Sequence, residues 1–423
     1  MLKRAKSITI ATLLPLTMAA ETVVTGKHVT VDAPASSGLD AIYVMADAAA
    51  CSIVYHAGSR EVKFFRFSDS GTAASTEFHP EAEGDTYTFK PAETDCGYMI
   101  TDGRKRSCFY TVNYRNHELR LQNLTVDSDN SDCERTALTL DGKAGPIYYY
   151  SVNARRMELS RELKLKYTTL QVSDDGEFIP AEQTVTIAGC DGKIFAGAPL
   201  CATCFTLEGD RFSSVWGTAQ RVESTSVNPQ AVKAITSALR QGESSDSGTE
   251  SDSAPAVITF KAALSDAAIF HEWQISDDPE FDKIRVSYSD PETTVTFDRA
   301  GTSFVRFEAA NADGSCRFYS ETYEVSIGES SITCPNAFSP GSSPGVNDEW
   351  RVKYKSITSF RCEIVNRWGV KVATLTHPSQ GWDGKKNGKP VAAGVYYYVI
   401  KAEGADGRKY NLSGDINILN SKY

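Results

Sequence analysis

The sequence predicts an all-β protein in which tandem β-sandwich modules precede a smaller C-terminal β-sandwich. Three observations carry this prediction: strand-like runs rich in β-branched and aromatic residues, turn residues that separate these runs, and a weak internal repeat. The chain has 423 residues, which is too long for one small core because domains commonly hold about 100 to 200 residues. We therefore expect several units along the chain.

The first 20 residues are expected to be a secretory signal peptide. Basic residues Lys3, Arg4 and Lys6 precede an apolar run over residues 8–18, and small residues stand before Glu21. The apolar run has 11 residues, whereas a membrane-spanning helix needs about 20. No cysteine lies near the predicted cleavage point, so a lipid anchor is not expected there.

The charge balance argues against nucleic acid as a partner. The chain carries 44 Lys and Arg against 54 Asp and Glu, a formal net charge of -10. A chain with this balance has no general attraction to phosphate backbones, which are bound mainly by basic side chains.

A weak repeat marks three modules in the body of the chain. In each copy an apolar strand end runs into a Ser-Asp turn, at Ser68, Ser173 and Ser276, with spacings of 105 and 103 residues. This period exceeds the roughly 20 to 50 residues of solenoid repeats and suits an immunoglobulin-like (Ig-like) or PKD-like β-sandwich of about 100 residues. The predicted modules are residues 22–115, 116–222 and 255–330.

The strands are predicted from composition and partial alternation of apolar with polar residues. An Asp-Gly pair also recurs near the end of each module, beginning at Asp102, Asp191 and Asp313, and is expected to form a hairpin turn before a final strand. The best-supported strands cover residues 41–46, 61–67, 118–126, 163–172 and 302–309.

Residues 223–254 are expected to form a short helix and a Ser- and Asp-rich linker. Asn228 is a predicted helix N-cap, with Pro229 at the first helical position and apolar residues continuing to Leu239. Residues 242–254, GESSDSGTESDSA, contain too little apolar area to offset the entropy of an ordered chain. Flexibility is therefore expected there.

The cysteines are expected to form disulfides, because an exported chain enters an oxidising compartment. Cys201 and Cys204 have a spacing found in zinc and redox sites, but no second Cys or His pair at ligand spacing accompanies them. A structural disulfide is the favoured interpretation, and spacing leaves the pairing open. The ten cysteines are Cys51, Cys96, Cys108, Cys133, Cys190, Cys201, Cys204, Cys316, Cys334 and Cys362.

The last 90 or so residues, 333–423, have a different composition and carry five ordered motifs. They are Pro335 to Pro340 (PNAFSP), Gly345 to Asp348 (GVND), Val365 to Gly369 (VNRWG), Gly381 to Gly384 (GWDG), and Gly388 to Pro390 (GKP) followed by Gly394 to Tyr398 (GVYYY). This terminal module resembles the type B, gliding-motility-associated, C-terminal sorting domain of type IX secretion cargo. The resemblance implies export across the outer membrane to the cell surface, with the type IX translocon and a PorP/SprF-like outer-membrane barrel as partners.

The motifs supply the candidate sorting and partner-binding residues. A role in the fold is favoured for most of them, with Trp368 and Trp382 as core anchors; Arg367 either stacks on Trp368 or faces an acidic partner. Relatives usually carry Asn-Gly-Asp-Gly after PNAFSP, whereas residues 341–345 read GSSPG, so neither a metal nor any other cofactor is expected. The candidates are Pro335, Asn336, Phe338, Pro340, Asn347, Asp348, Arg367, Trp368, Gly369, Trp382, Asp383, Gly384, Gly394 and Tyr396.

Catalytic motifs are not evident, and no enzyme activity is expected. The six histidines are scattered. The acidic pairs Asp174 with Asp175 and Asp277 with Asp278 recur in the repeated turns, which favours solvated turn residues over catalytic acids. Ser253, followed by Ala254, fits an Asp-Ser-apolar glycosylation pattern of bacteria with type IX secretion, with an unmodified linker as the alternative. The leading hypothesis is a surface binding or assembly protein, an adhesin included, with a surface polysaccharide or host ligand as an open partner. The alternative is a secreted hydrolase or carbohydrate-binding protein acting through residues 22–222, where no family resemblance is evident.

Overall fold

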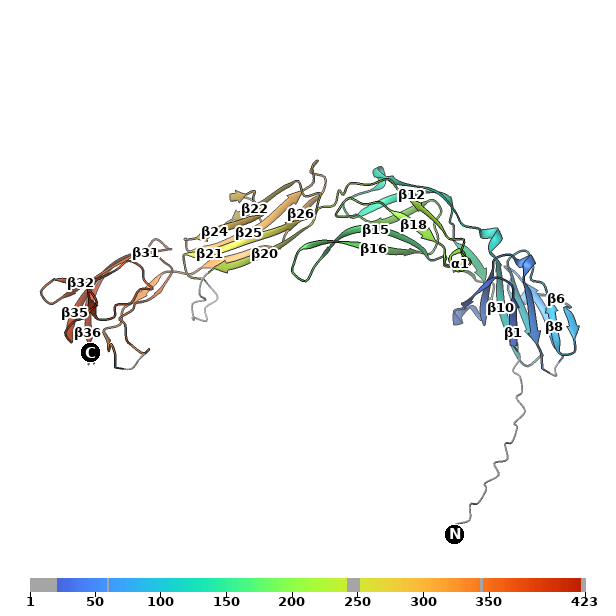
Figure 1. The fold of residues 1–423 in the computed structure, drawn as a ribbon, viewed down its shortest axis with the longest axis horizontal. Coiled ribbons are helices and arrows are strands. Elements are labelled where there is room, and N and C mark those ends of the chain that lie inside the picture. Colours follow the sequence, from blue (N-terminus) through green and yellow to red (C-terminus); the bar gives the residue numbers. More distant parts are fainter. Residues whose placement is uncertain (1–20, 59–60, 242–251, 343–344, 420–423) are drawn as a thin grey trace, which may run out of the picture. The chain divides into compact units, whose positions relative to one another are not determined.

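The computed structural model describes residues 21–58, 61–241, 252–342 and 345–419. The chain forms two compact units, Met1–Thr169 with Ala181–Asn228, and Leu170–Pro180 with Pro229–Tyr423. Strands dominate both units (Figure 1), which confirms the all-β prediction. Within the described ranges, no helix is long and apolar enough to cross a membrane. The predicted signal peptide lies outside the described residues.

The first unit begins with two sheets that enclose a core of large side chains. Ile53 from one sheet packs with Phe64, Tyr98 and Phe109 from the other, and all four are almost fully buried. One sheet has the order β1 (Glu21–Thr25), β4 (Ser52–His56), β8 (Thr86–Phe89) and β7 (Glu81–Glu83). The other has the order β2 (His28–Asp32), β3 (Ala41–Met45), β10 (Arg106–Asn113), β9 (Cys96–Thr101), β5 (Lys63–Phe67) and β6 (Thr76–Phe78). Short 3-10 turns follow β2, β3 and β5, at η1 (Ala35–Ser37), η2 (Ala48–Ala50) and η3 (Thr72–Ala74).

The rest of the first unit consists of three small sheets and one short helix. The first sheet has the order β11 (Arg120–Asp127), β12 (Arg135–Lys143) and β17 (Lys193–Gly197). A hairpin pairs β13 (Ile147–Tyr150) with β14 (Arg156–Leu159). The third sheet has the order β16 (Phe178–Ile187), β15 (Leu163–Val172), β18 (Thr206–Gly209) and β19 (Gln220–Glu223). The helical turns are η4 (Tyr114–His117), η5 (Ser128–Asn130) and α1 (Arg211–Val215).

Strand β10 is buried on both faces, and this links the first two predicted modules. Phe109 faces the first core, whereas Tyr110 joins a second hydrophobic cluster that contains Tyr149 of the β13–β14 hairpin, with ring centroids 6.0 Å apart. At the hairpin tip, Val152 donates its N–H to the Ser37 carbonyl at 3.0 Å and accepts from the Thr72 N–H at 2.9 Å. The hairpin therefore covers what would otherwise be an exposed face of the six-stranded sheet.

A buried ion pair also stabilises this region. The Arg161 guanidinium lies 2.6 Å from a carboxylate oxygen of Asp210, and the two side chains are 3% and 0% exposed. Tyr114 donates its hydroxyl hydrogen to Asp210 at 3.1 Å, and Asp210 caps α1 by accepting from the Ser213 N–H at 2.9 Å. Arg161 donates to the Gly145 carbonyl at 2.7 Å. These partners compensate the cost of removing both charges from water.

The second unit begins with a sandwich around Phe260, Trp273 and Phe307, which are fully buried. One sheet has the order β20 (Ala234–Gln241), β21 (Ala256–Leu264) and β24 (Glu292–Phe297). The other has the order β23 (Ile284–Tyr288), β22 (Phe270–Ser276), β25 (Gly301–Ala310) and β26 (Arg317–Tyr319), with β27 (Tyr323–Ile327) also on β25.

The short helix predicted between Asn228 and Leu239 is wrong. That segment contains strand β20, which pairs with β21 from Ala234 opposite Leu264 to Gln241 opposite Val257. Helix-start signals at Asn228 and Pro229 are weak local preferences, and pairing along a strand of eight residues overrides them.

The predicted turns fit the structure in part. Asp102-Gly103 joins β9 to β10, and Asp313-Gly314 joins β25 to β26, as hairpins. Asp191-Gly192 instead leads from β16 into β17, which lies in a different sheet, so the hairpin prediction is wrong there. The five strands predicted from composition match β3, β5, β11, β15 and β25.

The terminal module contains a five-stranded sheet and two small strand pairs. The sheet has the order β29 (Ala337–Phe338), β36 (Lys409–Ile418), β35 (Gly394–Gly404), β31 (Ile357–Asn366) and β32 (Lys371–Leu375). The small pairs are β28 (Ser331–Thr333) with β30 (Lys353–Lys355), and β33 (Lys385–Lys386) with β34 (Lys389–Pro390). Just before β28, Ser330 donates its hydroxyl hydrogen to Asp406 at 2.7 Å and accepts at its carbonyl from the Tyr410 hydroxyl at 2.8 Å.

The expectation that all the cysteines form disulfides is confirmed for some and wrong for others. Cys133 and Cys316 are disulfide-bonded. Burial raises the pKa of the Cys362 thiol to about 12 and that of Cys108 to about 11, and such thiols pack as small apolar side chains. The buried side chains of Cys51, Cys96, Cys108, Cys190 and Cys362 are present as thiols. The disulfide prediction is wrong for these five.

Candidate partner-binding site

The turn between β31 and β32 places two large side chains of the terminal module in solvent. Asn366 shapes it by accepting from the backbone N–H groups of Trp368 at 3.1 Å and Val370 at 3.0 Å, while Gly369 has φ of 79°. Trp368 is 72% exposed, and the Arg367 guanidinium lies 4.4 Å from the centre of its ring. The prediction that Trp368 is a core anchor is therefore wrong. The alternative of Arg367 stacking on Trp368 is confirmed, and we call residues 366–369 the Arg–Trp turn.

The core of the terminal module contains Trp382, as predicted, and also Trp350. These residues are 3% and 0% exposed and bond to each other through their backbones, with both N–H to carbonyl distances 2.9 Å. The Trp350 indole N–H donates to the Pro335 carbonyl at 2.6 Å, and that of Trp382 donates to Lys385 at 2.9 Å. Trp350 stands outside the five sequence motifs, which is why motif comparison did not select it.

Several other predicted residues support the fold. Phe338 is buried with its ring 5.6 Å from that of Trp382, and the Tyr396 ring lies 5.2 Å from the same tryptophan. The Tyr396 hydroxyl donates to the Ala392 carbonyl at 2.9 Å. The Asn336 carbonyl accepts from the Asn417 N–H at 2.8 Å. These contacts join the first motif to the last strands of the sheet.

The remaining polar candidates shape loops. Asp348 accepts from the N–H groups of Gly341 at 3.0 Å and Gly345 at 2.6 Å, so its carboxylate closes the loop that departs from the family pattern. Asp383 accepts from the backbone N–H of Lys385 at 3.0 Å. Over the described residues, no group of three or more His, Cys, Asp or Glu side chains comes together as a candidate metal site. The absence of a metal stays a prediction.

A feature that sequence reasoning missed lies on the solvent face of the five-stranded sheet. Strand β35 presents Val395, Tyr397 and Val399 there, with exposed fractions of 45%, 44% and 47%. We call these three residues the outer ridge. The sequence identifies Gly394 to Tyr398 as a family motif, but without the sheet register the motif does not reveal which of its residues face water.

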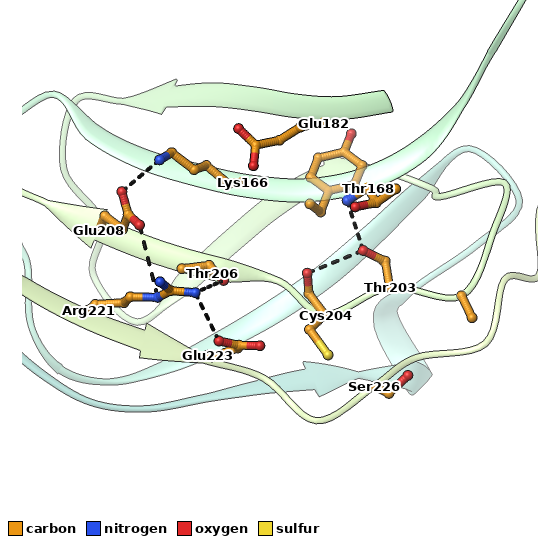
Figure 2. Close-up of a pocket in the computed structure, with 12 residues that line it drawn as sticks. Lys166, Thr168, Glu182, Thr203, Cys204, Thr206, Glu208, Arg221, Glu223 and Ser226 are labelled. Atoms are coloured by element: carbon orange, nitrogen blue, oxygen red, sulfur yellow. Dashed lines mark hydrogen bonds and ion pairs between the residues drawn. The ribbon is translucent and has the colours of Figure 1, made fainter. Parts of the chain in front are cut away.

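The first unit contains a polar groove of about 510 Å³ over strands β15, β16, β18 and β19 (Figure 2). Lys166 pairs with Glu208 at 2.9 Å, and Arg221 pairs with Glu223 at 3.1 Å while also lying 4.0 Å from Glu208. The hydrogen bond to Glu208 raises the pKa of Lys166. The pairs of Lys166 and Arg221 with Glu208 run between strands, and such cross-strand pairs of opposite charge stabilise a solvated sheet face.

Cys204 lines the same groove and is present as a thiol, so its expected disulfide is absent. The groove also contains Glu182, on β16 beyond Lys166 (Figure 2). The acidic pairs considered as catalytic candidates lie elsewhere, in turns. Asp278 there accepts from the Asp282 N–H at 3.1 Å, which is the role expected for a turn residue.

Ser253, the candidate glycosylation residue, is part of an ordered segment. Its hydroxyl oxygen accepts from the Ser356 N–H at 2.8 Å, and neighbouring Asp252 forms a parallel bridge with Ile327. Ala254 is 2% exposed. Residues 252–254 are therefore attached to strands of the second unit, so the flexibility expected there is wrong for these three residues; residues 242–251 lie outside the described part of the chain.

Comparison with known families places two regions of the chain. Residues 332–418 match the family model described as the CHU_C type IX secretion signal domain, and residues 125–224 match that of the fibronectin type III domain. The second match falls almost entirely in residues 22–222, where the sequence alone suggested no family resemblance. No curated protein matches the chain.

Three solved structures that match this chain share little sequence with it. The tetra-tandem repeat in the extending region of a large adhesion protein is 11% identical, covering 95% of this chain and 100% of that chain, with a TM-score of 0.24. Chicken CNTN1 FN1–FN3 domains are 14% identical, covering 71% and 99%, with a TM-score of 0.22. A Ca²⁺-stabilised adhesin that helps an Antarctic bacterium bind ice is 11% identical, covering 87% and 93%, with a TM-score of 0.18.

The fold and the two family matches define a modular all-β protein with a fibronectin type III or Ig-like region upstream of a C-terminal sorting domain. The chain is cargo of the type IX secretion system. Its signal domain directs export across the outer membrane to the cell surface.

Proposed function

We propose that this chain is a non-catalytic binding or assembly component that remains docked at the outer membrane through its terminal module. The modules 22–115, 116–222 and 255–330, the last of them PKD-like, then form the platform or adhesive part. The observation that carries the proposal is the Arg–Trp turn. Trp368 is 72% exposed beside Arg367 in a module whose other two tryptophans are buried.

An exposed tryptophan with an arginine stacked on it combines two residue types that are enriched at protein interfaces. Tryptophan, tyrosine and arginine dominate the energetics of protein interfaces. The polar candidates Asp348 and Asp383 accept hydrogen bonds within their own loops, so Arg367 and Trp368 remain the predicted residues best placed for a partner. A PorP/SprF-like barrel is the docking partner that the family resemblance favours.

Deleting residues 332–423 tests the export and docking function. We expect the truncated chain to accumulate inside the cell envelope, while the full chain is accessible to protease on intact cells. Crosslinking on intact cells then identifies the neighbour of the full chain. An outer-membrane barrel as the main product supports docking; normal surface exposure of the truncated chain contradicts the proposal.

A second candidate is carbohydrate binding in the polar groove. Glu182, Glu208 and Arg221 line it together with several hydroxyl groups, and such groups suit the hydroxyls of a sugar. Binding of the full chain to an array of surface polysaccharides checks this candidate. Loss of binding in an Arg221→Gln variant, with an unchanged melting temperature, assigns it to the groove, while equal binding by both contradicts it.

A further inference from the structure

The outer ridge is unusual for a strand with one face in solvent. Such strands normally alternate apolar residues inward with polar residues outward. Strand β35 instead places Tyr396 and Ile400 in the core and Val395, Tyr397 and Val399 outward. Since both faces carry large apolar side chains, the outward face is available to be buried by something else.

The sheet register extends this apolar surface to the next strand. Val365 of β31 lies directly opposite Tyr397, so its side chain shares the outward face. Val365 is followed one residue later by the Arg–Trp turn, in which Trp368 and Arg367 are exposed. The ridge and the turn together supply tyrosine, tryptophan and arginine, the residue types that contribute most to protein interfaces.

Carboxylates flank the ridge in register and limit what can cover it. Asp415 of β36 lies opposite Tyr397, and Glu363 of β31 lies opposite Val399. A hydrocarbon layer pressed on this face would remove Asp415 and the ion-paired Glu363 from water, which is costly even for charges that have partners. A protein surface can cover the valines and still offer hydrogen-bond donors to the carboxylates, so protein is favoured over lipid.

The charge of the terminal module distinguishes it from the rest of the chain. Residues 332–418 carry 12 Lys and Arg against 7 Asp and Glu, a net charge of +5, in a chain whose net charge is -10. Next to the ridge, Arg361 and Lys371 are more than half exposed and lie 2.8 Å and 3.7 Å from Glu363. Two such faces repel each other, which disfavours pairing with the same face of a second copy, and a partner with an acidic rim is attracted.

We propose that the outer ridge and the Arg–Trp turn form one docking face for a protein of the outer membrane, and that this protein presents an apolar strip bordered by Asp and Glu. This inference rests on the proposed function and adds the face and the chemistry of the partner. It assigns the contact to β35 and the β31–β32 turn, and leaves the buried motif residues to hold that face in shape.

Photocrosslinking from Tyr397 in the full chain tests the proposal. A benzophenone amino acid replaces Tyr397 in cells that carry the type IX machinery, and irradiation is done on intact cells. We expect one main adduct with an outer-membrane protein. In the same background, Val395→Thr with Val399→Thr, or Arg367→Glu, should lower the adduct at least tenfold, because each removes part of the apolar strip or reverses the attracting charge.

A matched control separates this effect from general surface change. Val23 and Val286 are also strand valines, 39% and 40% exposed, and the pair Val23→Thr with Val286→Thr should leave the adduct unchanged. Melting temperatures of the purified full chains show that each variant folds.

The inference is overturned if Tyr397 crosslinks to lipid or to a second copy of the chain, or if it forms no crosslink. It is also overturned if the ridge variants leave the crosslink unchanged. Export itself is read separately by protease accessibility of the chain without residues 332–423. If that truncated chain still reaches the surface, the proposed function fails. If the truncated chain is retained but the adduct does not respond to the ridge variants, only the docking face is overturned.

Discussion

The terminal module and the polar groove of the first unit present opposite kinds of surface. In the groove, Lys166 and Arg221 are satisfied by Glu208 and Glu223, so a ligand has to compete with interactions that already exist. On the terminal module, the outer ridge and Trp368 hold apolar area in water, and covering it gains free energy of about 25 cal/mol for each Å². We therefore expect binding energy to be concentrated in the terminal module and not in the groove.

The largest expected effect is the difference in stability between substituting a buried and an exposed tryptophan of the terminal module. Trp350→Ala should lower the free energy of unfolding of the second unit by about 3 to 5 kcal/mol, because it empties a fully buried site. Trp368→Ala should change it by less than about 0.5 kcal/mol, as for exposed residues. Denaturant unfolding of both variants measures this. Equal destabilisation would mean that Trp368 is a core residue after all.

A smaller effect is expected in the first unit, from the buried ion pair. Tyr114→Phe removes a hydroxyl that donates to Asp210 at 3.1 Å, and losing a hydrogen bond to a charged group costs about 1.5 to 3 kcal/mol. Thermal unfolding of the first unit within the full chain should shift down accordingly. Tyr148→Phe, at a half-buried tyrosine of β13, is the control and should leave the transition in place.

The groove should respond more weakly still. Arg221→Gln breaks pairs with partly exposed Glu208 and Glu223, and such pairs contribute about 0 to 1 kcal/mol. We expect near-normal melting and normal export of this variant, in contrast to the effect of Arg367→Glu on docking. A groove variant that abolished the photocrosslink from Tyr397 would contradict the division of roles between the two surfaces.

The smallest expected effect is on the pH dependence of stability, through the contact between Asp406 and Ser330. Hydrogen bonds from Ser330 lower the pKa of Asp406 below its ordinary value of 3.8. Because the folded pKa is lower than the unfolded one, this carboxylate stabilises the fold above the unfolded pKa, and the contribution is lost as pH falls through the folded pKa. Asp406→Asn should therefore lower the melting temperature slightly at pH 7 and hardly at all near pH 2. A difference that persists unchanged at low pH would refute this.

The sequence predicted strands best where composition and pattern agree. The predicted strand 163–172 has the same bounds as β15. Most of its ten side chains are apolar or Thr, a composition that favours a strand over a helix. The helix before residue 240 failed because its cap signals are local, whereas β20 is fixed by pairing with β21. The terminal module was identified from motifs that lie in its turns and core.

The candidate site was predictable only in part, because exposure depends on register. Trp368 and Trp382 both stand beside glycines in similar motifs, yet one is 72% exposed and the other 3%. The outer ridge becomes visible only once Tyr397 is placed between Val365 and Asp415 in the sheet. Likewise, the sequence around residue 149 does not predict that the β13–β14 hairpin packs on β10.

The β13–β14 hairpin has a mechanical consequence for a surface protein. Its tip is bonded to the backbones of Ser37 and Thr72, and Tyr149 packs against Tyr110 of β10. We therefore expect that a tensile load on residues 21–169 has to separate the hairpin from the six-stranded sheet before the chain near residue 115 can bend. The same contact means that a fragment ending at residue 115 would expose Tyr110 and Val112 to water. Such a fragment would be prone to aggregate, and this part of the chain is best produced as a single piece.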